Sequence, residues 1–152
     1  MKTLITGATG FLGSAIMRHL LDAGHDVRVL VRAKSNRRNL NDFPVEIREG
    51  DLRDTCSIKR AVSGCDNLFH VAADYRLWIP DPGVMYVTNV IGTRSLILAA
   101  AEAGLKRMVY TSSVATLGFK PDGSPADETT PSSLSLQNKP YNNLQININC
   151  LW

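Results

Sequence analysis

Three glycines near the start of the chain have a spacing that suits phosphate binding. Gly7, Gly10 and Gly13 follow a short apolar run at residues 2–6. Glycines at such a strand-to-helix junction let backbone N–H groups approach a pyrophosphate, which then lies at the positive end of the helix. The pattern therefore predicts a dinucleotide site at residues 7–13. The predicted contacts are Gly7, Thr9, Gly10, Phe11, Leu12 and Gly13.

A second group of chemically informative residues follows the apolar run at residues 27–31. In NAD-preferring sites an acidic residue near this position binds the ribose 2′-hydroxyl. This chain has Arg32 there, with Ser35, Arg37 and Arg38 close behind. A guanidinium at this point would pair with a 2′-phosphate, and the loop would add charge and a hydroxyl. The pattern favours NADP over NAD as the cofactor, and the alternative interpretation is a solvated basic loop.

The elements that must position these residues alternate between strand and helix. Strands are predicted at residues 2–6, 27–31, 45–48, 67–72 and 108–111, and helices at 11–23, 54–63 and 82–104. Asp81 followed by Pro82 is typical of an N-cap with proline at the first helical position. Strands alternating with helices predict an α/β fold with a parallel sheet covered on both faces. Right-handed crossovers then give the doubly wound, Rossmann-type order 3-2-1-4-5.

Length and composition indicate an ordinary globular domain. The chain has 152 residues, of which 44% are apolar and 20% charged, and its net charge of +3 is too small to indicate a nucleic-acid partner. The strand predicted at residues 2–6 leaves no room for a leader sequence, and the longest strongly apolar stretch, at residues 96–101, is too short to cross a membrane. Cys56, Cys65 and Cys150 have no metal-like spacing and are expected to be reduced thiols. We therefore expect a cytoplasmic protein without a metal.

Taken together, the motifs resemble those of the extended short-chain dehydrogenase/reductases, of the NAD(P)-dependent epimerase/dehydratase type. The matching segments lie at residues 6–13, 50–54, 70–73, 89–93 and 110–113. Within that family the chain is most similar to the dihydroflavonol-reductase-like branch, especially the hopanoid-associated sugar epimerases, on residues 71–78, 111–118 and 121–131. The similarity extends from Met1 to about Leu134.

The resemblance implies further contacts with the cofactor. Asp51 and Leu52 would contact the adenine, Ala72 and Ala73 the ribose beside the nicotinamide, and Asn89 would also belong to the cofactor site. The family's reaction is hydride transfer between the nicotinamide and a carbon that bears oxygen. A tyrosine transfers the proton of that oxygen, a serine or threonine donates a hydrogen bond to it, and a lysine four residues after the tyrosine lowers the pKa of the phenol.

The catalytic set implied by the resemblance is incomplete. Ser113 is the candidate hydroxyl, with Ser112 as the alternative, and Tyr141 is the only tyrosine after the fifth predicted strand. A free phenol titrates near pH ~10, so the family's chemistry needs a cation close to it. Gln145 stands where that lysine is expected, and Lys139 lies two residues before the tyrosine, which places it on a different helix face.

The end of the chain differs in composition from the rest. Residues 135–152 contain five Asn and two Gln but no acid, whereas the preceding 134 residues contain only five other Asn. We therefore divide the chain into an NAD(P)-binding domain at 1–134 and an atypical tail at 135–152. A typical family member is about twice as long, so we expect the chain to be truncated before the C-terminal substrate region, and a frameshift or degraded gene end would explain the tail.

Two functions are consistent with these observations. The first is an NADP-dependent oxidoreductase or a nucleotide-sugar epimerase/dehydratase that acts on a small molecule, such as a nucleotide sugar or a ketone or alcohol. The second is a catalytically inactive dinucleotide-binding module or a truncated gene product. The resemblance also implies a homodimer formed through the helix that begins near Pro82.

Overall fold

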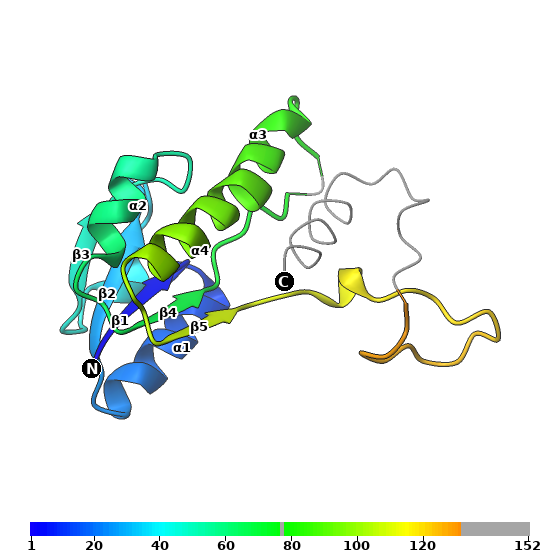
Figure 1. The fold of residues 1–152 in the computed structure, drawn as a ribbon, viewed down its shortest axis with the longest axis horizontal. Coiled ribbons are helices and arrows are strands. Elements are labelled where there is room, and N and C mark those ends of the chain that lie inside the picture. Colours follow the sequence, from blue (N-terminus) through cyan, green and yellow to red (C-terminus); the bar gives the residue numbers. More distant parts are fainter. Residues whose placement is uncertain (77, 132–152) are drawn as a thin grey trace. The chain divides into compact units, whose positions relative to one another are not determined.

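A parallel sheet with helices on both faces organises the chain (Figure 1), and the computed structural model describes residues 1–76 and 78–131. The strands are β1 (Lys2–Thr6), β2 (Asp26–Val31), β3 (Glu46–Glu49), β4 (Asn67–His70) and β5 (Arg107–Tyr110). They lie in the order β3-β2-β1-β4-β5, and each neighbouring pair is parallel. The predicted fold class and strand order are confirmed.

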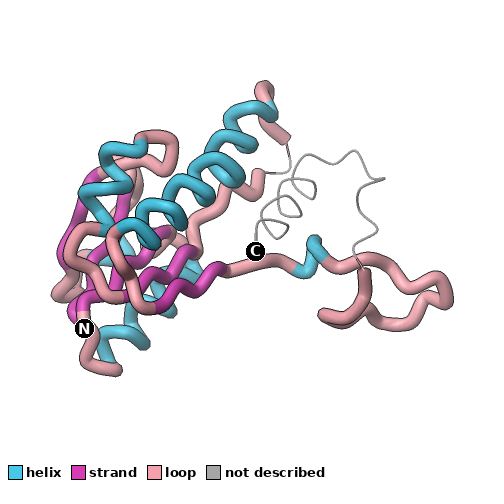
Figure 2. The backbone as a smooth tube through the Cα atoms, in the orientation of Figure 1, coloured by secondary structure: helices cyan, strands magenta, loops and turns pink. Residues whose placement is uncertain are grey.

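The helices follow the predicted alternation with one difference. They are α1 (Phe11–Asp22), α2 (Thr55–Val62), α3 (Pro82–Tyr86) and α4 (Thr93–Glu102), with short 3₁₀ turns at Arg38–Leu40 and Val114–Thr116 (Figure 2). The predicted N-cap is confirmed, because the Asp81 carboxylate accepts from the Gly83 N–H at 2.8 Å. The helix predicted over residues 82–104 is present as one helical stretch, Pro82–Glu102. The difference is a π-helical segment, Val87–Gly92, between α3 and α4.

The described residues belong to two compact units. The first consists of Met1–Ala73 and Gly92–Thr111, and it contains the whole sheet together with α1, α2 and α4. The second contains, among the described residues, those of 74–91 and 112–131, and it includes α3. The boundary predicted at residue 134 lies outside the described residues.

Strand side chains alternate between two hydrophobic layers, one on each face of the sheet. Leu4, Leu30 and Leu68 point toward α2 and α4, where they pack with Ile58, Ala61, Leu96 and Ala99. Ile5, Val29 and Val31 belong to the opposite layer, which packs against Met17 and Leu20 of α1. Figure 1 shows the same arrangement, with α2 and α4 on one side of the sheet and α1 on the other.

The helical stretch Pro82–Glu102 is long and apolar. Among the described residues it is the one helix whose 21-residue length and composition would allow it to cross a membrane. We expected no apolar stretch long enough to cross a membrane, because we considered only residues 96–101 and this helix is longer than that range. Leu96, Ala99 and Ala100 of this helix are buried in the layer between the sheet and α2. Only part of its apolar surface is buried, because Ile91 and Leu98 are exposed.

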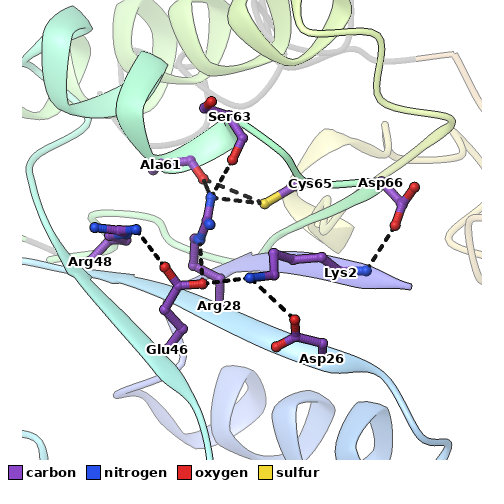
Figure 3. A network of polar contacts seen from close by, with 9 residues as sticks. All are labelled: Lys2, Asp26, Arg28, Glu46, Arg48, Ala61, Ser63, Cys65 and Asp66. Carbon is purple, nitrogen blue, oxygen red and sulfur yellow. Dashed lines mark hydrogen bonds and ion pairs between the residues drawn. The ribbon is translucent and has the colours of Figure 1, made fainter.

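A charged network joins the amino ends of the first three strands to the end of α2 (Figure 3). The Arg28 side chain is 7% exposed; its Nε donates to Glu46 at 3.0 Å, and its Nη1 donates to the carbonyls of Ala61 at 2.8 Å and Ser63 at 2.6 Å. Hydrogen bonds from Lys2 and Arg28 lower the pKa of Glu46 to about 2. The guanidinium thus satisfies carbonyls at the C-terminus of α2, where a cation is favoured.

Candidate dinucleotide-binding site

The carboxyl ends of the parallel strands bring the predicted segments to one edge of the sheet. Gly7 follows β1, Arg32 follows β2, Gly50 follows β3, Val71 follows β4 and Thr111 follows β5. In open α/β sheets ligands bind at this edge, where the strand order reverses direction. The reversal here lies between β1 and β4, directly beside the glycine turn.

The glycine turn depends on backbone contacts that no side chain could allow. Gly7 has φ +79°, and a Cβ on it would lie 2.7 Å from the backbone nitrogen of Ala72. A Cβ on Gly13 would lie 2.1 Å from the carbonyl oxygen of Gly7. The Gly10 N–H donates to that same carbonyl at 2.9 Å and closes the turn. The first turn of α1 is therefore held directly against the end of β1 and the start of the loop after β4.

The N-terminus of α1 suits an anion. The helix begins at Phe11 with Gly10 as N-cap, and among the described residues no side chain caps it and its first turn contains no acid. The first N–H groups of a helix have no partner within the helix, and its dipole favours negative charge there. The side chains of Phe11 and Leu12 are exposed. This arrangement fits a pyrophosphate held by backbone amides, as predicted for residues 7–13.

A buried histidine connects the glycine turn to α4. His70 Nδ1 lies 2.6 Å from the Thr6 hydroxyl, and its Nε2 lies 2.8 Å from the Thr93 hydroxyl. The Thr6 hydroxyl oxygen also accepts from the N–H groups of Val71 at 3.3 Å and Ala72 at 3.2 Å. Since those donors occupy its lone pairs, we infer that the hydroxyl donates to Nδ1 and that Nε2 carries the ring proton.

Complete burial keeps this histidine neutral. His70 is 1% exposed, and desolvation lowers its pKa to about 4. The sequence analysis did not predict the bonds of His70 to Thr6 and Thr93, which lie 64 and 23 residues away along the chain. The same contacts explain why β4 ends at His70 and not at residue 72, because the next two amides turn toward the Thr6 hydroxyl.

The basic loop after β2 is fastened to the glycine turn. The Asn39 side-chain amide donates to the Thr9 carbonyl at 2.9 Å, and Leu40 is buried in the core layer below α1. Arg32 is exposed, and the Arg37 guanidinium pairs with the Glu49 carboxylate. Sequence reasoning missed Asn39 and Glu49, since neither stands in a recognisable motif. The loop therefore brings its cations to the edge of the sheet where the glycine turn lies.

Asp51, the predicted adenine contact, is held in place by its neighbour. Its carboxylate accepts from Arg53 Nε at 3.0 Å and Arg53 Nη2 at 2.7 Å. Hydrogen bonds from Arg53 lower the pKa of Asp51, and the charge of Arg32 contributes in the same direction. Leu52 is half-buried, and a Cβ on Gly92 would lie 2.9 Å from it, which explains a glycine at the start of α4. The adenine contacts themselves stay predictions.

In the second unit, Asn89 fixes the loop that follows β4. Its side chain is buried; Oδ1 accepts from the Asp74 N–H at 2.7 Å and Nδ2 donates to the Asp74 carbonyl at 2.7 Å. The oxygen and the nitrogen of the Asn89 side-chain amide are therefore both bonded to the backbone of Asp74. Asn89 lies in the π-helical segment Val87–Gly92. A contact of Asn89 with the dinucleotide stays a prediction, and the structure gives the residue a role in holding the loop.

The predicted catalytic residues are placed only in part. Ser113 belongs to the second unit; its side chain is half-buried, and its carbonyl accepts from the Thr116 hydroxyl at 2.7 Å. Tyr141 and Gln145 lie outside the described residues. Ala72 and Ala73 lie in the loop after β4 and belong to the first unit. Ala72 is half-buried and Ala73 is exposed. The structure thus brings together the predicted pyrophosphate and adenosine residues, while the catalytic roles of Ser113 and Tyr141 stay predictions.

The sheet order, the glycine turn and the uncapped helix define a Rossmann-type fold, the architecture in which dinucleotides bind at such a turn. The model of the NAD dependent epimerase/dehydratase family matches residues 3–146, and the chain belongs to this family.

Several relatives in this group carry names of reductases. The chain is 48% identical over 128 residues to a putative dihydroflavonol 4-reductase of Synechocystis sp., covering 84% of this chain and 37% of the relative. It is 41% identical over 132 residues to sterol demethylase protein B of Methylococcus capsulatus, covering 87% and 40%. The chain therefore spans about two fifths of the length of these curated relatives.

Solved structures show the same fold. The crystal structure of gox2253 superposes with a TM-score of 0.90 at 50% identity, covering 98% of this chain and 45% of that one. UDP-glucose 4-epimerase of Thermus thermophilus, in complex with NAD, superposes with a TM-score of 0.86 at 30% identity, covering 99% and 49%.

We predict that Gly7→Ala abolishes dinucleotide binding. The new Cβ would meet the Ala72 backbone and push β1 away from the loop after β4. Gly24→Ala is the matched control, because Gly24 has φ +77° but nothing within 4 Å of a Cβ. Both variants lose about 1–2 kcal/mol of stability from the left-handed conformation. Only Gly7→Ala should lose binding in a fluorescence titration with NADPH and NADH, and equal losses in both variants would contradict the prediction.

We also predict that His70→Asn lowers the free energy of unfolding by about 2–3 kcal/mol at pH 7, because it leaves a buried hydroxyl without its partner. The folded-state pKa of His70 lies below its usual value of 6.5. The unfolded state therefore binds the proton first, and wild-type stability falls by about 3 kcal/mol as the pH drops from 6.5 to 4.

Urea unfolding of both proteins between pH 7 and pH 4 measures this effect. The stability difference between wild type and His70→Asn should narrow over that interval, since the variant has no ring to protonate. His19→Asn, at an exposed position on α1, serves as the control and should follow the wild-type pH profile. A difference that stays constant with pH would refute the neutral, buried role of His70.

Proposed function

We propose that this chain is the cofactor-binding part of an NADP-linked oxidoreductase or nucleotide-sugar epimerase/dehydratase, acting on a carbonyl or alcohol carbon of a small molecule. Membership of the family supports the class of reaction, and the reductase names of the relatives support an oxidoreductase. The observation that carries the choice of NADP is the exposed Arg32 directly after β2, at the position where NAD-binding sites place an acid.

The surroundings of Arg32 support the same choice. Arg32, Lys34 and Arg38 are exposed cations on a loop that Asn39 fastens to the glycine turn. A planar guanidinium can bind a phosphate through two parallel N–H groups, which a ribose hydroxyl does not require. The Thermus epimerase and an Agrobacterium tumefaciens superfamily protein, which is 29% identical to this chain, were solved with NAD. NAD is therefore the competing assignment.

The bound nicotinamide would supply or accept the hydride. On the proposal, Gly7, Gly10 and Gly13 hold the pyrophosphate against the amides of α1. Ser113 donates a hydrogen bond to the reacting oxygen and Tyr141 transfers its proton, so that the charge developing on that oxygen is neutralised. The second candidate function, a dinucleotide-binding module without turnover, is favoured by Gln145 in the place of the lysine.

Arg32→Gln tests the choice of cofactor. We expect NADPH to bind at least ten-fold more weakly to the variant, because a hydrogen bond between charged groups contributes about 1.5–3 kcal/mol. NADH binding should stay within two-fold. Arg60→Gln, at an exposed position on α2, controls for the loss of one positive charge. Tighter binding of NADH than of NADPH to the wild-type chain would overturn the assignment of NADP.

Turnover separates the enzyme from the binding module. We expect the chain to oxidise NADPH in the presence of a carbonyl substrate, such as a dihydroflavonol or a 3-oxoacyl compound, and Tyr141→Phe to remove that activity while leaving NADPH binding unchanged. Absorbance at the NADPH band follows the reaction, and fluorescence quenching follows the binding. NADPH binding without turnover of any carbonyl would favour the module.

A further inference from the structure

We propose that Glu49 competes with the 2′-phosphate of the cofactor for the Arg37 guanidinium, and so weakens the discrimination of NADP from NAD. The proposal rests on the binding of NADP proposed above. It gives Glu49, a residue outside every motif in the sequence, a role in cofactor specificity.

Glu49 lies at the sheet edge where the phosphate is expected. It is the last residue of β3 and pairs in register with Val31, the last residue of β2. The Gly50 N–H donates to the Val31 carbonyl at 2.9 Å, so the two strands remain joined up to this point. Arg32 is the next residue along the chain after β2. The Glu49 carboxylate is thus carried on the strand beside the one that leads into the proposed phosphate-binding arginine.

The charges of the loop make this carboxylate distinctive. Residues 32–38 carry four cations and no acid. Two acids follow on the neighbouring strand end, Glu49 and Asp51. The Asp51 carboxylate accepts hydrogen bonds from Nε and Nη2 of Arg53, whereas the Glu49 carboxylate pairs with Arg37 of the basic loop. Within the described residues, Glu49 is therefore the acid that forms an ion pair with the loop, whereas Asp51 acts on Arg32 through its charge alone.

The exposure of the pair makes it exchangeable. The side chain of Glu49 is 57% exposed and that of Arg37 is 32% exposed, so separating them requires little rearrangement of the protein. An exposed ion pair of this kind contributes only about 0.2–1 kcal/mol. A phosphate is an equally good partner for a guanidinium and carries more charge than a carboxylate. A bound 2′-phosphate could therefore take Arg37 from Glu49, but it must first separate the pair.

Only one of the two cofactors has to separate the pair of Arg37 and Glu49. The 2′-hydroxyl of NAD is neutral and leaves the pair of Arg37 and Glu49 intact. The 2′-phosphate of NADP must break the pair before it can bind the Arg37 guanidinium. Glu49 thus weakens the binding of NADP without affecting that of NAD, and its removal should widen the preference for NADP.

Glu49→Gln tests the proposal in the full chain, with NADPH and NADH as the probes. We expect the dissociation constant for NADPH to fall about two- to five-fold at low ionic strength, which corresponds to the loss of one exposed ion pair. That for NADH should stay unchanged, and the gain for NADPH should shrink at 0.5 M salt because exposed charges are screened. Thermal unfolding of each variant verifies that it is folded.

Two controls identify the partner through which Glu49 acts. In an Arg37→Gln background the further change Glu49→Gln should no longer tighten the binding of NADPH, because the guanidinium for which the two anions compete is gone. Glu102→Gln removes a matched exposed carboxylate, paired with Lys59 on α2, and should leave both dissociation constants unchanged.

Each remaining outcome contradicts the proposal in a recognisable way. Weaker NADPH binding in Glu49→Gln would mean that Glu49 positions Arg37 for the phosphate, and weaker NADH binding would mean that Glu49 accepts from the ribose hydroxyls. An effect that persists without Arg37, or that Glu102→Gln reproduces, would show a general effect of charge. Unchanged NADPH binding in Glu49→Gln overturns this inference alone, whereas failure of the wild-type chain to bind NADPH overturns the proposed function with it.

Discussion

The arrangement of the site depends on the direct approach of the Gly7 backbone to the backbone of Ala72. A Cβ on Gly7 would lie 2.7 Å from the Ala72 nitrogen, so the two chain segments touch without an intervening side chain. The Thr6 hydroxyl maintains this approach, because it accepts from the amides of Val71 and Ala72 while bonding to His70. The position of the glycine turn, and with it the start of α1, therefore follows from polar contacts made one residue earlier.

This constraint requires a neutral histidine. A protonated His70 would present a donor to the Thr6 hydroxyl, which already receives two amide donors, and its charge would lie in a fully buried position. The Thr93 hydroxyl at the second ring nitrogen links the same ring to the first residue of α4. Gly92, beside it, lets α4 approach Leu52. Adjacent residues at the start of α4 thus connect the ends of β4 and β3 to one helix.

Much of this architecture could be predicted from the sequence, since it depends on local patterns. The alternation of apolar runs gave the strand order, and the spacing of Gly7, Gly10 and Gly13 gave the position of the turn. Contacts between distant residues could not be predicted this way. The bond from Asn39 to the Thr9 carbonyl and the pair of Arg37 and Glu49 depend on the path of an irregular loop, which no periodicity specifies. Asn89, in the π-helical segment, likewise bonds to the backbone of Asp74, 15 residues earlier in the chain.

At the amino and carboxyl edges of the sheet, Arg28 and Arg32 use their charges in opposite ways. At the amino edge, Arg28 is buried and its guanidinium is satisfied by Glu46 and by carbonyls at the end of α2. A cation engaged in this way is unavailable to a ligand. At the carboxyl edge, Arg32 and Lys34 are exposed, and the pair formed by Arg37 and Glu49 is partly exposed. Cations held near a surface by loop anchors such as Asn39 keep their charge available, and on the proposed function they would attract an anionic cofactor to the carboxyl edge.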